Sequence, residues 1–269
     1  MQKAGLEILP NFSIKFPEYS VITPYSKFEY TLRGLKVSEE EALKSSLLLP
    51  NKFSEHLNDV LYSVMIKKPE EIKTKEDFLK KNTLKDRDAL MFALYHVTYK
   101  DVHPYELTCS QCSEKNNVKI NFLNSFSVTF WDQPEQALSK EVMVKLEQAE
   151  QLTFVVGLPS LFEEQQMLSE LSAVSDKERQ KKVALLPIKY ILIDIASAKK
   201  QDKIVDRINI QRVYDDLPVS DRKLIDKALK DNFEKYGSTI KVISNCQKCR
   251  AEINTEIDLV NQFFRAMYE

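Results

Sequence analysis

The chain has 269 residues, of which 43% are hydrophobic and 29% charged, and its 39 basic and 40 acidic residues leave a net charge of −1. This is the composition of an ordinary globular protein with enough chain to bury a core, without the excess of lysine and arginine typical of nucleic-acid-binding surfaces. Only four glycines are present, and neither common glycine-rich phosphate-binding motif, G-x-x-x-x-G-K-[ST] or G-x-G-x-x-G, occurs.

Hydrophobic residues do not form a run long enough to cross a membrane, which takes about 18 residues, and the N-terminal residues lack the apolar core of a signal peptide. We therefore expect a soluble protein without a transmembrane segment, made in a cytoplasm. In that reducing compartment a C-x2-C pair indicates a metal site or a redox site rather than a structural disulfide.

Residues 1–26 are predicted to form an extended N-terminal arm, because three prolines are spread along them. Aromatic side chains in the arm and in the C-terminal tail, with one methionine among the latter, are candidates for contacts with partner proteins, since aromatic residues anchor interfaces. Packing against the protein's own core is the alternative. The candidates are Phe12, Phe16, Tyr19, Tyr25, Phe263, Phe264, Met267 and Tyr268.

Residues 27–150 are predicted to form an N-terminal lobe. Alternation and helical periodicity predict a strand over 27–35, then helices over 38–48, 51–67 and 82–99. Ser38 is expected to cap the first helix, and Thr83 the third. The third helix is apolar around most of its circumference, so we expect it at the centre of the lobe. Two strands, 103–109 and 117–123, flank the first C-x2-C pair.

Residues 151–269 are predicted to form a C-terminal lobe. Helical periodicity favours helices over 139–152, over 159–200 with interruptions at its prolines, and over 215–237. Ser220 is expected to cap the last of these, and Gly237 to end it. Strands over 238–246 and 254–260 flank the second C-x2-C pair.

The two cysteine regions resemble each other. Each runs from a capped helix through a strand to C-x2-C and into a second strand, and each helix begins near an Asp-Arg pair, Asp86-Arg87 in one and Asp221-Arg222 in the other. An internal repeat of this kind predicts two related lobes that each contribute one cysteine pair. The fold class expected is α+β, with helices and short antiparallel strands in both lobes.

The four cysteines, Cys109, Cys112, Cys246 and Cys249, all belong to C-x2-C pairs. Two such pairs supply the four thiolates of a closed, tetrahedral structural zinc site. Because residues 113–245 separate the pairs, a shared Zn2+ would join the two lobes in a zinc-ribbon-like arrangement. Three alternatives stay open: free thiols left from a lost site, a separate metal at each pair, and a redox pair, which normally opens a helix rather than lying between strands.

Catalytic motifs are scarce. The chain has three histidines, and the H-E-x-x-H, G-x-S-x-G and zinc-deaminase patterns are absent. Acidic pairs such as Asp86 and Asp88 are interpreted as helix caps. No enzymatic activity or small-molecule substrate is expected. A zinc-ribbon nucleic-acid-binding protein, with the lysine-rich segment 67–81 as its surface, is one alternative, and a metal-dependent hydrolase is a second.

Five segments in this order resemble the baseplate hub subunit family of T-even-type contractile-tailed phages. The segments are KFEYTLRGLKVSEEEAL, TLKDRDALMFALYHVTYKDVHPYELTCSQC, VYDDLPVSDRKLIDKAL, NCQKCRAEINTEIDL and the pair Phe263-Phe264, within residues 27–264. The resemblance implies a structural or assembly protein that helps to build the baseplate hub and binds other hub and tail proteins. It also implies residence in the host cytoplasm during assembly, and it leaves two alternatives open: the protein stays in the tail baseplate of the virion, or it acts only in assembly.

Overall fold

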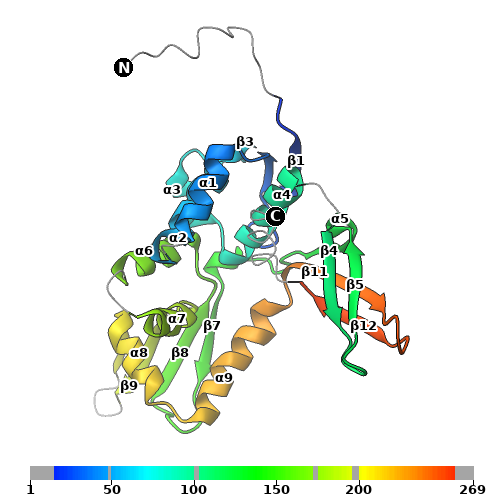
Figure 1. The fold of residues 1–269 in the computed structure, drawn as a ribbon. Helices are drawn as coiled ribbons and strands as arrows, with labels where there is room; N and C mark the ends of the chain where they lie inside the picture. The colour runs from blue at the N-terminus through cyan, green and yellow to red at the C-terminus, as the bar shows by residue number, and fades with distance from the viewer. Residues whose placement is uncertain (1–14, 48–49, 100–102, 172–174, 196–199, 258–269) are drawn as a thin grey trace.

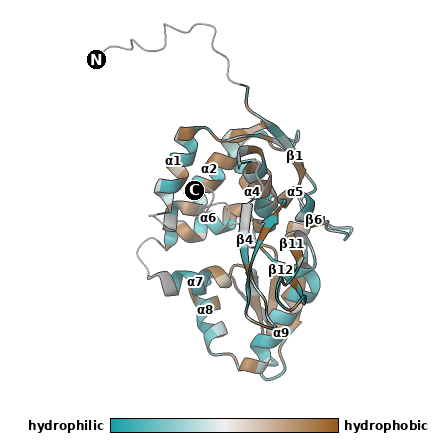
Figure 2. Ribbon diagram, turned by 45° about the vertical axis from the view of Figure 1, so that its right-hand side comes forward, coloured by the Kyte–Doolittle hydropathy of each residue, from teal (hydrophilic) through white to brown (hydrophobic). Residues whose placement is uncertain are grey.

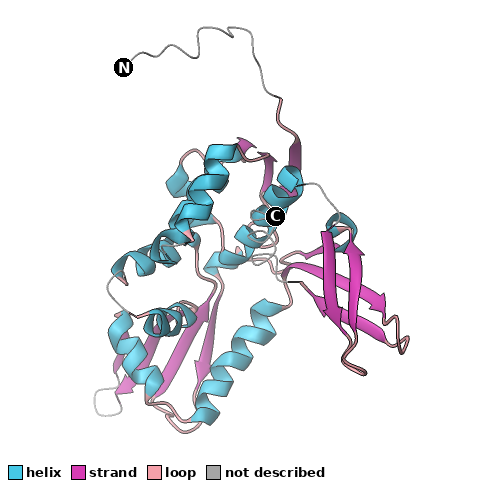
Figure 3. Cartoon of the chain, viewed as in Figure 1, coloured by secondary structure: helices cyan, strands magenta, loops and turns pink. Residues whose placement is uncertain are grey.

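The computed structural model describes residues 15–47, 50–99, 103–171, 175–195 and 200–257. Helices and antiparallel strands alternate along these residues, so the α+β class is confirmed (Figure 3). Helices and sheets pack into one elongated body, and two pairs of strands extend from its side (Figure 1).

The first half contains a small sheet covered by helices. Its strands lie in the order β1-β2-β3, all antiparallel. The elements are β1 (Glu18–Ile22), β2 (Glu29–Arg33), α1 (Val37–Ser46), α2 (Pro50–Val64), β3 (Met65–Lys67), α3 (Lys75–Lys81), α4 (Leu84–Tyr99), β4 (His103–Thr108), β5 (Lys115–Ile120), α5 (Phe122–Ser125) and β6 (Phe126–Thr129).

Helix α4 lies at the centre of the main hydrophobic core, as predicted from its apolar circumference. Every residue from Ala89 to Tyr95 is buried. Strands β1 and β2 and helices α1 to α3 surround it, and Ile240 and Cys246 from the other half join the same core. This core therefore contains residues from both ends of the sequence.

The second half contains a four-stranded antiparallel sheet in the order β10-β9-β8-β7, with helices α8 and α9 contributing to its core. A three-stranded sheet, β12-β11-β6, joins the two halves. The elements are a short 3-10 turn (Ala137–Ser139), β7 (Glu141–Lys145), β8 (Leu152–Gly157), α6 (Leu161–Glu170), α7 (Asp176–Ala184), β9 (Ile188–Ile195), β10 (Lys200–Ile204), α8 (Arg207–Asp215), α9 (Val219–Leu229), a π-helical turn (Lys230–Glu234), β11 (Gly237–Asn245) and β12 (Glu252–Glu256).

Of the two helical segments predicted in the middle region, the first is wrong and the second is right only before Pro187. Residues 139–152 contain strand β7, whose residues Glu141 to Lys145 pair with β8 along their whole length. Among the described residues of 159–200, α6 and α7 are the helices, and strands β9 and β10 follow Pro187. Proline prevents the helix from continuing, and the β-branched isoleucines of β9 pack well on a pleated sheet.

Two predicted helix caps are also wrong. Helix α1 begins after Lys36 rather than Ser38, and its N3 residue Glu39 accepts the Lys36 backbone N–H at 2.9 Å. Helix α9 begins after Pro218 rather than Ser220. Gly237 starts β11 instead of directly ending a helix, at a φ of 127° that favours glycine.

The predicted N-terminal arm lies outside the described residues up to position 14, and its later part includes β1. Two of its aromatic side chains pack on the protein itself. Tyr25 is buried beside Trp131, with ring centroids 5.8 Å apart, and Tyr19 lies edge-on to Phe92 at 6.3 Å.

For the buried Tyr25, partner contact is the wrong prediction. Tyr19 is half-buried, as is Phe16, whose ring centre lies 5.2 Å from the Arg33 guanidinium carbon, so partner contact stays a prediction for these two. Phe12 and the aromatic tail residues 263–268 lie outside the described residues.

Candidate metal centre

The first cysteine pair lies in the turn between β4 and β5. These strands pair in register from His103 opposite Ile120 to Thr108 opposite Lys115. The Cys109 backbone N–H donates to the Glu114 carbonyl at 2.9 Å, and the Ser113 N–H donates to the Cys109 carbonyl at 2.9 Å. The turn thus folds back tightly, and Ser113 adopts a left-handed φ of 58°.

The second pair repeats the same turn between β11 and β12. The Cys246 N–H donates to the Ala251 carbonyl at 2.8 Å, and the Arg250 N–H donates to the Cys246 carbonyl at 2.9 Å. Arg250 has a φ of 61°, at the position equivalent to Ser113. A left-handed conformation is unfavourable for residues other than glycine. Its recurrence at equivalent positions therefore indicates that both cysteine pairs require this turn geometry.

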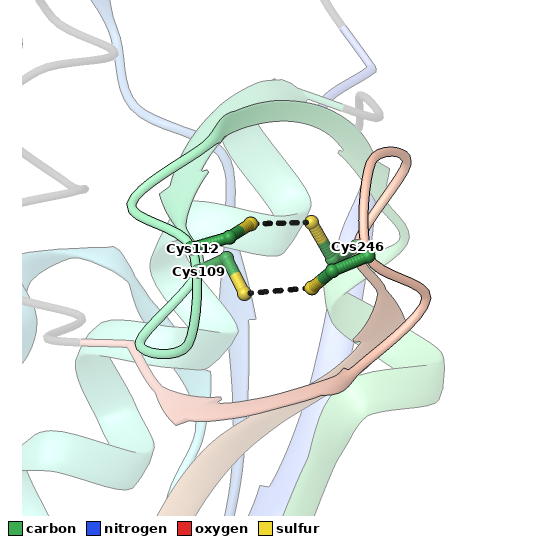
Figure 4. A group of neighbouring side chains, drawn as sticks. Cys109, Cys112 and Cys246 are labelled. Carbon is green, nitrogen blue, oxygen red and sulfur yellow. Dashed lines mark hydrogen bonds between the residues drawn. The ribbon is translucent and has the colours of Figure 1, made fainter.

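The four sulfur atoms converge between the two turns (Figure 4). All lie within 4.8 Å of one another, with 3.6 Å between Cys109 and Cys249 and 3.6 Å between Cys112 and Cys246. The thiols are free rather than disulfide-bonded. A tetrahedral ion with Zn–S bonds of about 2.3 Å would hold its sulfurs roughly 3.8 Å apart, so the cluster is compatible with a metal site.

Asn116 connects the two turns beside the sulfur atoms. Its side chain is fully buried, and its Oδ1 accepts the Gln247 backbone N–H at 2.7 Å. Its Nδ2 donates to the Glu114 carbonyl at 3.0 Å and lies 3.7 Å from the Cys246 sulfur. Asn116, which belongs to the first hairpin, thus orients the turn of the second hairpin, and no sequence motif marks it for this role.

The electrostatics of the cluster favour a cation. The backbone N–H groups of Cys249 and Lys248, together with the sulfurs of Cys112 and Cys249, lower the pKa of Cys246 to about 6 against the cost of burial. A hydrogen bond with the Glu114 backbone acts to lower the pKa of Cys112. The neighbouring sulfurs of Cys249, Cys246 and Cys109 outweigh it and raise the pKa of Cys112 to about 12. Four adjacent thiols cannot all ionise without a compensating positive charge, which a bound metal ion supplies.

All four predicted cysteines are brought together here, and their role as metal ligands stays a prediction. Two of them, Cys109 and Cys246, are buried within the main hydrophobic core, whereas Cys249 is exposed. The site therefore lies where the core meets solvent. Among the acidic residues interpreted as caps, Asp86 has that role, since its carboxylate accepts the Thr83 backbone N–H at 2.8 Å.

Fold and site together define a mixed helix and antiparallel-strand protein whose two halves meet at a four-cysteine cluster. A family model described as T4 bacteriophage base plate protein matches residues 16–265, which include both cysteine pairs. The chain belongs to this family of T4-type phage baseplate proteins. Comparisons with curated proteins and with solved structures gave no match. Among the described residues, no helix has both the length and the apolar character needed to cross a membrane.

Proposed function

We propose that this protein is a non-enzymatic structural or assembly component of the baseplate hub, in which one zinc ion joins the two halves of the chain. The observation that carries the proposal is the convergence of four sulfurs, within 4.8 Å, from two C-x2-C pairs in a chain of the baseplate family. Its partners are other hub and tail proteins. It acts in the host cytoplasm during assembly and in the tail baseplate of the virion.

The ligand set supports a structural role for the metal. Four cysteine sulfurs complete the tetrahedral shell of zinc and leave no open position for water or a substrate. The ion would tie the β4–β5 hairpin of the first half to the β11–β12 hairpin of the second half, which lie side by side in Figure 1. Cys109, Cys112, Cys246 and Cys249 are the proposed ligands.

We further propose that residues 27–150 and 151–269 are two related lobes. Both halves run through a two-stranded hairpin, two helices, a third strand on the same sheet, two more helices, and then strand, cysteine turn and strand; the second half adds strand β10 directly after its third strand. The third strand, β3 or β9, pairs with the second strand of the hairpin in both halves. The predicted arm, residues 1–26, contributes β1 to the first hairpin, and residues 141–145, which precede the predicted boundary at 150, contribute β7 to the second hairpin.

One buried aspartate in each half supports the same relation. Asp86 is the third residue of α4 and accepts the Tyr25 and Ser26 backbone N–H groups, in the loop between β1 and β2, at 2.8 and 3.2 Å. Asp221 is the third residue of α9 and accepts the N–H groups of residues 147–149, in the loop between β7 and β8, at 3.1 to 3.2 Å. Both carboxylates are completely buried.

Metal analysis of the purified protein tests the zinc proposal. We expect about one zinc per chain in the native protein, and loss of zinc together with a lower melting temperature in Cys246→Ser. The matched control is Ser110→Ala, which changes an exposed residue inside the first turn and should keep the metal. Two metals per chain, or none, would contradict a single shared site.

Affinity capture from infected cells tests the hub role. A tagged copy is expressed during infection, and its partners are quantified by mass spectrometry. We expect hub and tail proteins to be enriched, and cells infected with phage lacking the gene to accumulate incomplete baseplates. Normal tail assembly without the protein would contradict the proposal.

A further inference from the structure

Helix α6 is the main contact that the second half makes with the helices of the first. It packs against α2 and α3, and its first residue, Leu161, is fully buried in the main core. The Leu161 backbone N–H donates to the Asn82 carbonyl, just before α4, at 3.0 Å. The first lobe therefore receives the beginning of α6 at a face formed by α2, α3 and the start of α4.

A bidentate ion pair holds α6 on this face. The Arg87 guanidinium on α4 donates to both carboxylate oxygens of Glu164 on α6, at 2.5 and 2.9 Å. The side chains of Arg87 and Glu164 are only 14% and 9% exposed, and the Ser54 hydroxyl on α2 donates to the same carboxylate. Paired charges excluded from water in this way specify which helix fits the face.

Helix α1 in the first lobe is the counterpart of α6. Each follows the second strand of its hairpin, and in each the N3 glutamate, Glu39 or Glu163, accepts the backbone N–H of the N-cap residue. Counting from this shared cap, Val37 corresponds to Leu161, and Glu40 corresponds to Glu164. Leu161 is completely buried, whereas Val37 is 72% exposed.

The receiving face also has a counterpart in the second lobe, formed by α7, α8 and the start of α9. Asp86 and Asp221 attach their helices to the hairpin loops in the same way, so the next residues, Arg87 and Arg222, lie on corresponding sides of α4 and α9. Arg222 is exposed, with its guanidinium carbon 5.4 Å from the centre of the Tyr214 ring. Within the described residues it makes no ion pair.

An exposed apolar side chain on this part of the second lobe also corresponds to a covered one on the receiving face of the first lobe. The first residue of α9, Val219, is 63% exposed, whereas its equivalent in α4, Leu84, packs against the main core beside α6. Ile208 on α8 is also 57% exposed, but it lines a hollow with Met167 of α6, so its exposure does not indicate an uncovered face. At Val219 and Arg222 the second lobe thus presents the features of a helix-receiving face that no described helix covers.

From this juxtaposition we propose that the start of helix α1 in a second copy of this protein docks on the α7, α8 and α9 face, in the way that α6 docks on α2, α3 and α4. The inference rests on the proposed relation between the two lobes and is independent of the metal. Val37 and Val219 form the apolar part of the contact, and Glu40 pairs with Arg222.

The first turn of α1 is acidic. Glu39 is held by Arg33 at 2.6 Å. Glu40, 24% exposed, accepts the Tyr99 hydroxyl at 3.0 Å and lies 3.3 Å from Lys44. Arg222 would therefore add a further donor to the Glu40 carboxylate.

The two faces lie at opposite ends of the molecule. Helix α1 lies at the upper end in Figures 1 and 2, and α8 lies near the lower end. A contact between unlike faces is heterologous, so each added copy exposes a new receiving face, and the assembly grows until it closes as a ring or continues as a filament. A hub component that assembles in this way would repeat its own internal packing between molecules.

Sedimentation analysis of Val37→Glu and Val219→Glu variants of the full chain tests this arrangement. Both valines are the first residue of a helix, where glutamate is compatible with the helix dipole, so the fold should be retained. We expect the native protein to associate as its concentration rises to about 100 μM, and each variant alone to stay monomeric. The control Ile243→Glu, at a 66% exposed residue of β11, should associate like the native protein.

Mixing the two variants separates a head-to-tail contact from other kinds. Val37→Glu keeps an intact receiving face and Val219→Glu keeps an intact α1, so the mixture should form a one-to-one complex and nothing larger. A monomeric native protein at about 100 μM, unchanged association of either variant, or a mixture that stays monomeric would overturn the inference. We expect one zinc per chain in all of these samples. Because zinc content is measured independently of association, a failure of the zinc proposal can be distinguished from a failure of the docking proposal.

Discussion

Two buried aspartates hold the hairpin loops of this protein onto its helices. Asp86 accepts the Thr83 backbone N–H at 2.8 Å and the Thr83 hydroxyl at 3.0 Å, in addition to the N–H groups of Tyr25 and Ser26. Burial acts to raise the pKa of its carboxyl, and the backbone donors of Thr83, Tyr25 and Ser26 oppose that effect. Each donor is a backbone group that would be left buried and unpaired without the carboxylate.

Replacing this aspartate should be far more damaging than replacing its neighbour. We expect Asp86→Ala to lower the free energy of unfolding by about 3 kcal/mol, because several buried N–H groups lose their acceptor. Asp88→Ala, two residues along the same helix and partly exposed, should change it by less than about 0.5 kcal/mol. Urea unfolding followed by circular dichroism measures both, and equal effects would show that Asp86 is only a surface cap.

At the scale of elements, the sequence predicts those parts whose pattern has a single interpretation. The helix over 82–99 is apolar on nearly all sides and ends within a residue or two of α4, and the cysteine turns are recognised by their flanking strands. Strand β7 was not predicted, because its five residues are too few to separate a period of two from one of 3.6. Strand β9 follows directly on a helical stretch, so only Pro187 marked the change.

Contacts between elements were beyond prediction from one sequence. Glu164 reads as an ordinary first-turn glutamate of α6, suited to the helix dipole, and its partner Arg87 lies on a distant helix. Asn116 likewise has the appearance of a turn residue beside a C-x2-C pair. The roles of Glu164 and Asn116 depend on which elements of the two lobes pack against each other. The sequence pattern around each residue does not contain that information.

The ion pair between α4 and α6 should be a strong link between the two halves. We expect Arg87→Met to lower the free energy of unfolding by about 3 kcal/mol, because the buried Glu164 carboxylate loses its partner. Arg222→Met, at the exposed equivalent position on α9, is the matched control and should have little effect on a single chain. A double-mutant cycle with Glu164→Gln measures the coupling, which we expect to exceed about 1 kcal/mol; additive effects would show that the pair does not couple the halves.

At the scale of the whole molecule, the cysteine cluster and the main core form one continuous region. Cys109 and Cys246 are buried within that core, and Ile240, Val242 and Ile253 from the β11–β12 hairpin pack in it beside α4. The sheet β7–β10 has its own core with α8 and α9. The proposed zinc therefore stabilises the packing between the two ends of the sequence, and the β7–β10 sheet depends on it less directly.

Metal removal should consequently loosen the protein unevenly. We expect chelation of the proposed zinc to speed amide hydrogen exchange most in the two hairpins, residues 103–120 and 237–256, because their turns lose the common ligand that holds them together. Exchange in α4 should rise less, and the β7–β10 sheet should keep most of its protection, since its core is separate. Exchange measured peptide by peptide by mass spectrometry, before chelation, after it and after zinc is returned, gives the comparison. Uniform loss of protection would show that the chain folds as one unit around the metal, and unchanged exchange in both hairpins would show that the four cysteines do not hold them.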